Sequence, residues 1–130
     1  MGIKLYVDDF RNPPDDTWEL CRTITKAIRI LATQDVSEVS LDHDIIFKRN
    51  KKSPDESETF EPVCRYIRLL NVMSEEASFP DNMREKFKEF QPIKVYIHSG
   101  NPFAYDKYSN ILGYKVQPLQ TREEPNGNSN

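Results

Sequence analysis

Three short apolar segments of this chain, residues 3–7, 38–41 and 93–97, each end directly in a cluster of acidic or histidine residues. Short runs of this kind, bounded by polar residues, predict buried strands. In an open parallel sheet, ligands bind outside the carboxyl ends of the strands, so side chains that follow different strands can meet in one crevice. The pattern therefore predicts one site at one edge of a parallel sheet. The clusters are Asp8-Asp9, Asp42-His43-Asp44 and His98-Ser99-Gly100-Asn101-Pro102.

The segment after the first apolar run is predicted to be a loop. Residues 10–17 contain Pro13-Pro14, which cannot continue a helix. Residues 18–22 then predict a second short strand, and Thr23 is placed to cap the helix that follows it. The first connection between strands is therefore a loop instead of a helix. The helix after Thr23 is predicted to bury Ile24, Ala27, Ile28 and Leu31, which keep the spacing of one helical face.

Three further helices are predicted in the second half of the chain. The first begins near Thr59, whose hydroxyl can cap it, and a short one begins at Asp81. The third starts with Asn101 as its N-cap and ends at Gly113, a residue typical of C-terminal caps. A fifth strand is expected at residues 114–117. The helix near Thr59 is predicted to bury Val63, Tyr66, Ile67 and Leu70.

The order of these elements indicates a three-layer α/β fold whose first crossover helix is replaced by a loop. With right-handed crossovers, the expected strand order in the parallel sheet is 2-1-3-4-5. The chain of 130 residues fits one domain, which we place at residues 1–120. The tail at residues 121–130 has too little apolar surface to order itself and is expected to be disordered.

Composition excludes several classes of protein. The net charge of −3 gives no field that would draw the chain to nucleic acid as a whole. No segment approaches the roughly 18 apolar residues of a membrane span. Cys21 and Cys64 match no disulfide or zinc motif, so we expect buried free thiols. These features favour a reducing, cytoplasmic compartment.

The aspartates of the first two clusters are candidates for a cation site. Several carboxylates in one crevice raise one another's pKa unless a cation is present. Mg²⁺ takes oxygen ligands of this kind and commonly shares them with a substrate phosphate. The alternative is that such aspartates cap turns and face water. The candidate ligands for Mg²⁺ or another divalent cation are Asp8, Asp9, Asp42 and Asp44.

The third cluster has the features of an anion site, because it joins a strand to the start of a helix through a glycine. Amide groups and the helix dipole at such a turn attract phosphate. Ser99 can donate its hydroxyl, and Gly100 and Asn101 can offer amides, although a well-capped helix would explain the same residues. Arg11 is a further phosphate candidate because a guanidinium can bind phosphate through two hydrogen bonds.

The chain's two histidines both fall in these clusters. Histidine titrates near neutral pH, so His43 and His98 could serve as general base and general acid on a phosphodiester, with Asp9 and Asp42 beside them. His43 could instead be a metal ligand. Tyr105 and Tyr108 could stack a base, although packing is the simpler use for at least one of them.

These residues resemble the receiver superfamily of response regulators, in which acids follow strands one and three and a hydroxyl residue follows strand four. Gln117-Pro118 stands where that superfamily has lysine before proline, which argues against phosphoacceptor signalling. The sequence more closely resembles the cyclic-phosphate-processing receiver domains, over about residues 3–118. The resemblance is carried by Leu5-Tyr-Val-Asp-Asp9, Trp18, Arg22-Thr23, Ser40-Leu-Asp-His-Asp44 and Ile97-His-Ser-Gly-Asn-Pro102.

This resemblance implies a three-layer receiver-like, flavodoxin-like fold that acts on cyclic or terminal phosphates of nucleotides or RNA. The leading hypothesis is therefore a phosphoesterase that uses the paired histidines and aspartates. One alternative is a module that binds a cyclic nucleotide or phosphorylated messenger without chemistry. Another is a degenerate receiver that acts through protein partners.

Overall fold

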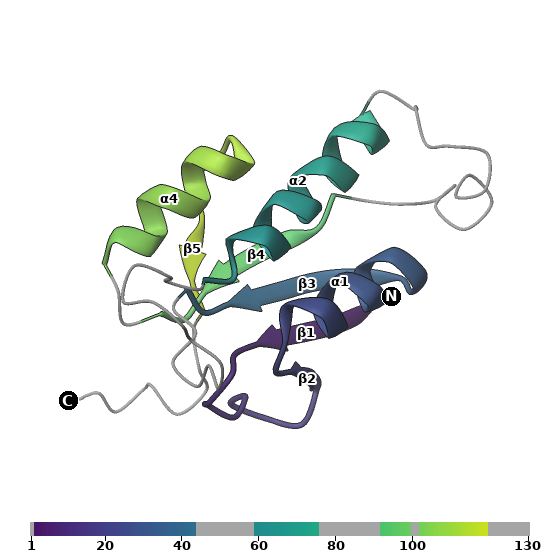
Figure 1. The fold of residues 1–130 in the computed structure, drawn as a ribbon, viewed down its shortest axis with the longest axis vertical. Coiled ribbons are helices and arrows are strands. Elements are labelled where there is room, and N and C mark those ends of the chain that lie inside the picture. The colour runs from purple at the N-terminus through teal and green to yellow at the C-terminus, as the bar shows by residue number, and fades with distance from the viewer. Residues whose placement is uncertain (1, 44–58, 76–91, 100–101, 120–130) are drawn as a thin grey trace, which may run out of the picture.

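The computed structural model describes residues 2–43, 59–75, 92–99 and 102–119 (Figure 1). Its five strands form one sheet in the order β2-β1-β3-β4-β5, and every neighbouring pair is parallel. This arrangement confirms the predicted receiver-like α/β fold. The strands are β1 (Ile3–Val7), β2 (Trp18–Cys21), β3 (Val36–Leu41), β4 (Lys94–Ile97) and β5 (Gln117–Pro118), and the helices are α1 (Ile24–Thr33), α2 (Glu61–Glu75) and α4 (Phe103–Leu112).

The connection between β1 and β2 contains no helix, as the prolines predict. The other described crossovers all run in the same direction across the sheet, from β2 towards β5. Right-handed crossovers then place α1, α2 and α4 on the same face, and α2 contacts both of the other helices. Alternate strand residues point to this face and form the core with the helices. They include Leu5, Val7, Val39, Leu41, Val95 and Ile97, all buried.

The opposite face of the sheet carries more polar residues. Tyr6 of β1 is in register with Ser40 of β3, and Ser40 with Tyr96 of β4. Tyr6 and Ser40 are buried, and Tyr96 is half-buried. Within the described residues no helix covers this face. A three-layer fold has helices on both faces of the sheet, and the described residues include the helices of one face. This face matters for function because Tyr6, Ser40 and Tyr96 are each followed two residues later by a predicted site residue, namely Asp8, Asp42 and His98.

Capping residues fix the helix ends largely as predicted. Thr23 is the N-cap of α1, and its side chain accepts a hydrogen bond of 3.1 Å from the Lys26 amide. The hydroxyl of Thr59 accepts from the Glu61 amide at the start of α2. Gly113 ends α4 with a φ of 86°, a backbone conformation that favours glycine. The caps thus fix where each helix begins or ends, and the side chains of these helices that face the sheet belong to the core.

The core of the helices differs in detail from the predicted faces. Ile30 is buried in α1, whereas the predicted Ile24 and Ile28 lie partly buried at its margin. In α2 the thiol of Cys64 is fully buried, and Tyr66 is only partly buried. The other predicted residues of the two faces are buried as expected: Ala27, Leu31, Val63, Ile67 and Leu70. None of the helices in the described part of the chain is long and apolar enough to cross a bilayer.

The C-terminal part differs in its boundaries. The last strand is Gln117–Pro118, so the prediction of residues 114–117 was wrong in position. Proline fits there because β5 is an edge strand and needs no amide on its outer side. Helix α4 begins at Phe103 with Pro102 before it, one residue later than predicted. The predicted helix from Asp81, the Asn101 cap and the tail at 121–130 lie outside the described residues.

Candidate functional site

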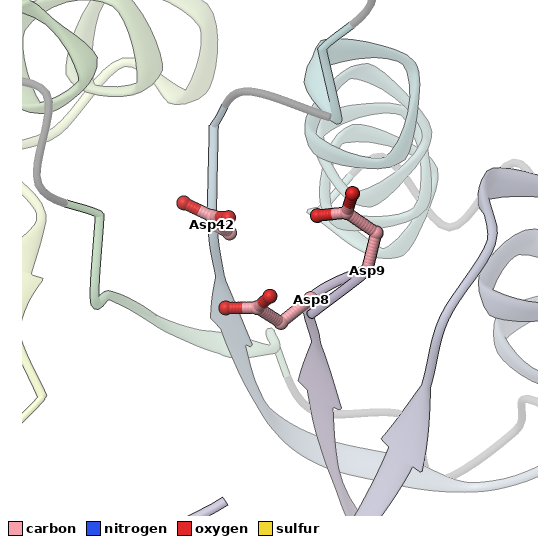
Figure 2. A group of neighbouring side chains, drawn as sticks. All are labelled: Asp8, Asp9 and Asp42. Atoms are coloured by element: carbon pink, nitrogen blue, oxygen red, sulfur yellow. The ribbon is translucent and has the colours of Figure 1, made fainter. Parts of the chain in front are cut away.

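Three carboxylates lie together at the carboxyl edge of the sheet. Asp8 and Asp9 follow β1, and Asp42 follows β3, the strand that pairs with it. Figure 2 shows the three side chains gathered where the two strands end, and one carboxylate oxygen from each lies within 4.8 Å of the others. Asp8 and Asp42 are buried, and Asp9 is half-buried. The predicted convergence of the first two clusters is therefore present in the structure.

Arg11 supplies positive charge to two of these acids. Its Nη1 lies 3.2 Å from Asp8 Oδ2 and 3.5 Å from Asp42 Oδ1. The same nitrogen donates to the carbonyl oxygen of His98 at 3.4 Å. The guanidinium thus joins the ends of β1, β3 and β4. Because 44% of the Arg11 side chain is exposed, an anion can still approach it.

The loop that presents Arg11 is held at both ends by hydrogen bonds. Asp8 Oδ1 accepts from the amides of Phe10 and Arg11, each at 2.8 Å. On the other side, the Arg22 guanidinium donates to the Arg11 carbonyl oxygen and to Asn12 Oδ1, each at 2.9 Å. A weaker bond of 3.4 Å joins Arg22 to the Asp8 carbonyl oxygen. These bonds fix the backbone that replaces the missing crossover helix.

His98 is bonded through both ring nitrogens. Its Nε2 lies 2.9 Å from Asp8 Oδ2, and its Nδ1 lies 2.6 Å from Ser40 Oγ. The ring also stacks on Tyr6, with centroids 4.0 Å apart and planes 8° from parallel. A neutral ring that donates from Nε2 and accepts the Ser40 hydroxyl proton at Nδ1 satisfies both contacts. His98 can therefore exchange a proton with a ligand only after one of these contacts opens.

His43 lies on the helical side of the sheet. Its amide donates to Asp42 Oδ1 at 2.8 Å, and its Nε2 lies 3.1 Å from Glu61 Oε2 at the start of α2. Lys107 of α4 reaches the same carboxylate oxygen at 3.3 Å. The hydroxyl of Tyr108 donates to the Asp42 carbonyl oxygen at 2.8 Å. Each histidine thus has a carboxylate partner, and the two rings lie on opposite faces of the sheet.

A sequence model of the cyclic-phosphate processing receiver domain matches residues 3–113. The chain belongs to this family. Comparisons with curated proteins and with solved structures gave no match. Membership confirms the resemblance drawn from the motifs and assigns the chain a role in cyclic-phosphate processing, with a phosphate-bearing substrate.

The two buried acids of the receiver domain have opposite electrostatic environments. Burial alone raises the pKa of Asp8, but hydrogen bonds from His98 and from the Arg11 and Phe10 amides lower it to about 2. Burial raises the pKa of Asp42, and the single bond from the His43 amide offsets this only in part. A nearby negative charge on Asp8 adds to the rise. The surroundings therefore favour the ionised form of Asp8 and disfavour that of Asp42.

Burial and neighbouring groups also shift the pKa values of Tyr6 and Glu61, in opposite directions. Burial and the charge of Asp8 raise the pKa of Tyr6 to about 12, so its hydroxyl stays protonated near neutral pH. Burial raises the pKa of Glu61, but the bonds to His43 and Lys107 outweigh it and lower the pKa overall. Glu61 is consequently a carboxylate that can orient the His43 ring.

The candidate residues of the receiver domain differ in how they are placed relative to the carboxylate cluster. Arg11 and His98 contact the carboxylate cluster through their side chains, whereas the backbone amide of His43 donates to Asp42 Oδ1. Ser99 is half-buried and is the second residue after the end of β4. Tyr108 is fully buried and bonded to the Asp42 carbonyl oxygen, so its use is packing. The remaining candidates, Asp44, Gly100 and Asn101, lie outside the described residues.

Sequence reasoning missed three residues that hold the site together. Ser40 bonds His98, Glu61 bonds His43, and Arg22 ties down the loop after Asp9. Ser40 and Arg22 stand inside the motifs that carry the family resemblance, which was a usable signal for both. Glu61 gave none, because a glutamate in a first helical turn is common on dipole grounds alone.

Proposed function

We propose that this receiver domain hydrolyses a cyclic phosphodiester on a nucleotide or RNA end at the carboxyl edge of its sheet. The observation that carries the proposal is the arrangement of charge around Arg11. A half-exposed guanidinium stands at the ends of three strands, with a histidine and carboxylate pair on each face of the sheet. Such a constellation combines an anchor for phosphate with two groups that can transfer protons.

The placement of the histidines on opposite faces suits displacement at phosphorus. In phosphoryl transfer, the attacking and leaving oxygens lie roughly in line, so the proton acceptor and donor are needed on opposite sides of the phosphorus. In the proposed reaction, one histidine takes a proton from a water molecule as the oxygen of that water forms a bond to phosphorus. The other histidine gives a proton to the ring oxygen whose bond to phosphorus breaks. The product is a phosphomonoester with a free hydroxyl.

Each histidine has a carboxylate that can orient it and stabilise its charged form. Glu61 stands at His43 Nε2, and Asp8 stands at His98 Nε2. A carboxylate in this position fixes the tautomer and the plane of the ring without itself changing protonation. For His98, proton exchange with a ligand requires one of its two ring contacts, to Asp8 or to Ser40, to open first.

The carboxylates also fit a divalent cation. Asp8, Asp9 and Asp42 offer three oxygens close together, and carboxylate oxygens are the ligands that Mg²⁺ prefers. The raised pKa of Asp42 supports this fit, because a nearby cation would stabilise the ionised carboxylate against the effect of burial. We propose that these three residues would hold Mg²⁺, and that Asp44 would join them. Once bound, the cation would polarise the phosphate and stabilise negative charge on its oxygens.

The phosphate is proposed to lie between Arg11 and the start of α4. Ser99 follows β4, and the Arg11 guanidinium already reaches the backbone of His98 beside it. Gly100 and Asn101, the other proposed phosphate contacts, follow Ser99 in the sequence. Amides at the start of a helix favour phosphate for electrostatic reasons.

Turnover assays with a panel of cyclic phosphates test the proposal. The purified protein is incubated with cyclic mononucleotides, cyclic dinucleotides and RNA ending in a 2′,3′-cyclic phosphate, with Mg²⁺ and with a chelator. We expect ring opening of at least one substrate and its loss in the Arg11→Ala variant. Absence of ring opening across the panel, in the presence of Mg²⁺, would contradict hydrolysis.

A second function is favoured by one observation, the saturation of both nitrogens of His98 by Asp8 and Ser40. If those contacts never open, the domain can capture a cyclic phosphate through Arg11 without changing it. Equilibrium binding followed by recovery of the ligand separates the two functions. Tight binding with complete recovery of unaltered ligand supports capture, and recovery of a ring-opened product supports hydrolysis.

A further inference from the structure

Two phenylalanine side chains are exposed at the same edge of the sheet as the charged cluster. Phe10 is 58% exposed and Phe103 is 73% exposed, whereas Phe60, the third phenylalanine in the described residues, is fully buried. The other large apolar side chains exposed in this part of the chain, Leu69 and Tyr114, lie on α2 and beyond the end of α4. The exposed phenyl rings are therefore concentrated beside the site.

The backbone holds both phenylalanines in defined positions. The amide of Phe10 donates to Asp8 Oδ1 at 2.8 Å, so Phe10 stands directly beside the carboxylate cluster. Phe103 is the first residue of α4, the helix that follows β4. Strand β3 lies between β1 and β4, and adjacent strands are about 4.8 Å apart, so the two strand ends lie roughly 10 Å from each other. Phe10 and Phe103 thus follow the two strands that lie on either side of β3, and Asp42 follows β3 itself.

We propose that Phe10 and Phe103 form a subsite for the base of the nucleotide whose phosphate lies at Arg11. The inference rests on the proposed function, because it assigns a place to the part of that substrate that carries no charge. A ribose separates the cyclic phosphate from the base, so a phosphate at the centre of the edge leaves the base at its rim. Phenyl rings at the rim offer π-faces to any base.

This chemistry predicts affinity for a nucleotide without a strong preference among bases. Stacking accepts every base because each has a π-face, whereas discrimination requires hydrogen bonds to base edges. The positive charge of Arg11 attracts the phosphate, and the uncharged rings add affinity only when a base is attached. The two contributions can therefore be separated by ligands with and without a base.

Binding measurements with two ligands that the proposed reaction does not consume test the subsite. The ligands are adenosine 3′-monophosphate, a ring-opened product, and inorganic phosphate. Titration calorimetry is run on the wild type and on Phe10→Ala, Phe103→Ala and Phe103→Tyr, with Leu69→Ala as the control for an exposed apolar residue away from the site. Thermal unfolding checks that each variant is folded.

The wild type is expected to bind the nucleotide more tightly than phosphate. Phe10→Ala and Phe103→Ala should each weaken nucleotide binding by about 5- to 150-fold, the range for loss of one stacked ring. Their affinity for phosphate should not change, Phe103→Tyr should retain nucleotide binding, and Leu69→Ala should behave as the wild type. Equal affinity of the wild type for both ligands, or alanine variants that leave nucleotide binding unchanged, would overturn the subsite.

Failure of the proposed function has a different signature. If Arg11→Ala leaves phosphate binding unaltered, or the wild type binds neither ligand, the phosphate site itself is wrong and the subsite falls with it. If phosphate binding depends on Arg11 but nucleotide binding does not depend on the two phenylalanines, only the subsite is overturned.

Discussion

At the scale of single residues, Asp8 connects more of the site than any other side chain described. One oxygen accepts two loop amides, and the other meets the His98 ring and the Arg11 guanidinium. These donors lower the pKa of Asp8 to about 2 although the carboxylate is fully buried. A charged group is kept inside the protein because every part of it is hydrogen-bonded.

Replacement of Asp8 by asparagine should lower stability in a pH-dependent manner. The folded-state pKa lies below the ordinary aspartate value of 3.8, so ionised Asp8 stabilises the native state above about pH 4, and this contribution is lost as the pH falls towards 2. At pH 7 we expect Asp8→Asn to reduce the free energy of unfolding by about 2 kcal/mol or more. Urea denaturation between pH 7 and pH 3 measures the difference.

The matched control for this prediction is Asp16→Asn, because Asp16 is exposed in the loop before β2. Its stability should follow that of the wild type at every pH. A difference between wild type and Asp8→Asn that stays constant, or grows, as the pH falls towards 3 would mean that Asp8 does not hold this charge in the native state.

At the scale of elements, the sequence predicted the strands and their order more completely than the contacts between side chains. Apolar runs ended by aspartate or histidine marked β1, β3 and β4, because burial and the edge of the sheet impose that pattern. Glu61 could not be predicted as the partner of His43, because that contact depends on how α2 begins relative to the end of β3. The position of β5 was missed because a short edge strand has little pattern of its own.

The loop between β1 and β2 is the element that most distinguishes the site, and Arg22 holds it. Because Arg22 is exposed, its replacement by glutamine should cost no more than about 1 kcal/mol of global stability. The loss of its bonds should loosen the backbone that carries Arg11, so we expect about tenfold weaker phosphate binding. Calorimetry with inorganic phosphate measures this change. Arg29→Gln, on the exposed face of α1, is the control.

Unchanged phosphate affinity in Arg22→Gln would contradict the positioning role. A drop in affinity that is matched by Arg29→Gln would instead reflect the loss of one positive charge from the surface.

At the scale of the whole molecule, the site is assembled from residues far apart in the chain. Asp8, Asp42 and His98 follow three neighbouring strands. His43 bonds to Glu61 of α2, and Lys107 of α4 reaches the same glutamate. A ligand that binds all three strand ends should therefore stabilise the entire fold, because it binds the native state and not the unfolded chain.

Mg²⁺ should raise the melting temperature if the three aspartates hold it. A ligand present at about 100 times its dissociation constant stabilises the native state by about 2.7 kcal/mol. We expect the shift in the wild type and in Asp16→Asn, and its loss in Asp9→Asn and Asp42→Asn. Differential scanning calorimetry with and without Mg²⁺ measures it. An equal shift in Asp9→Asn and Asp42→Asn would place the cation elsewhere.

The most direct test of the proposed hydrolysis is a ³¹P NMR time course with an RNA that ends in adenosine 2′,3′-cyclic phosphate. The wild type should convert the cyclic phosphate resonance into that of a phosphomonoester, and the double variant His43→Ala with His98→Ala should not. Ring opening that persists at the wild-type rate in the folded double variant would contradict the assignment of proton transfer to these two histidines.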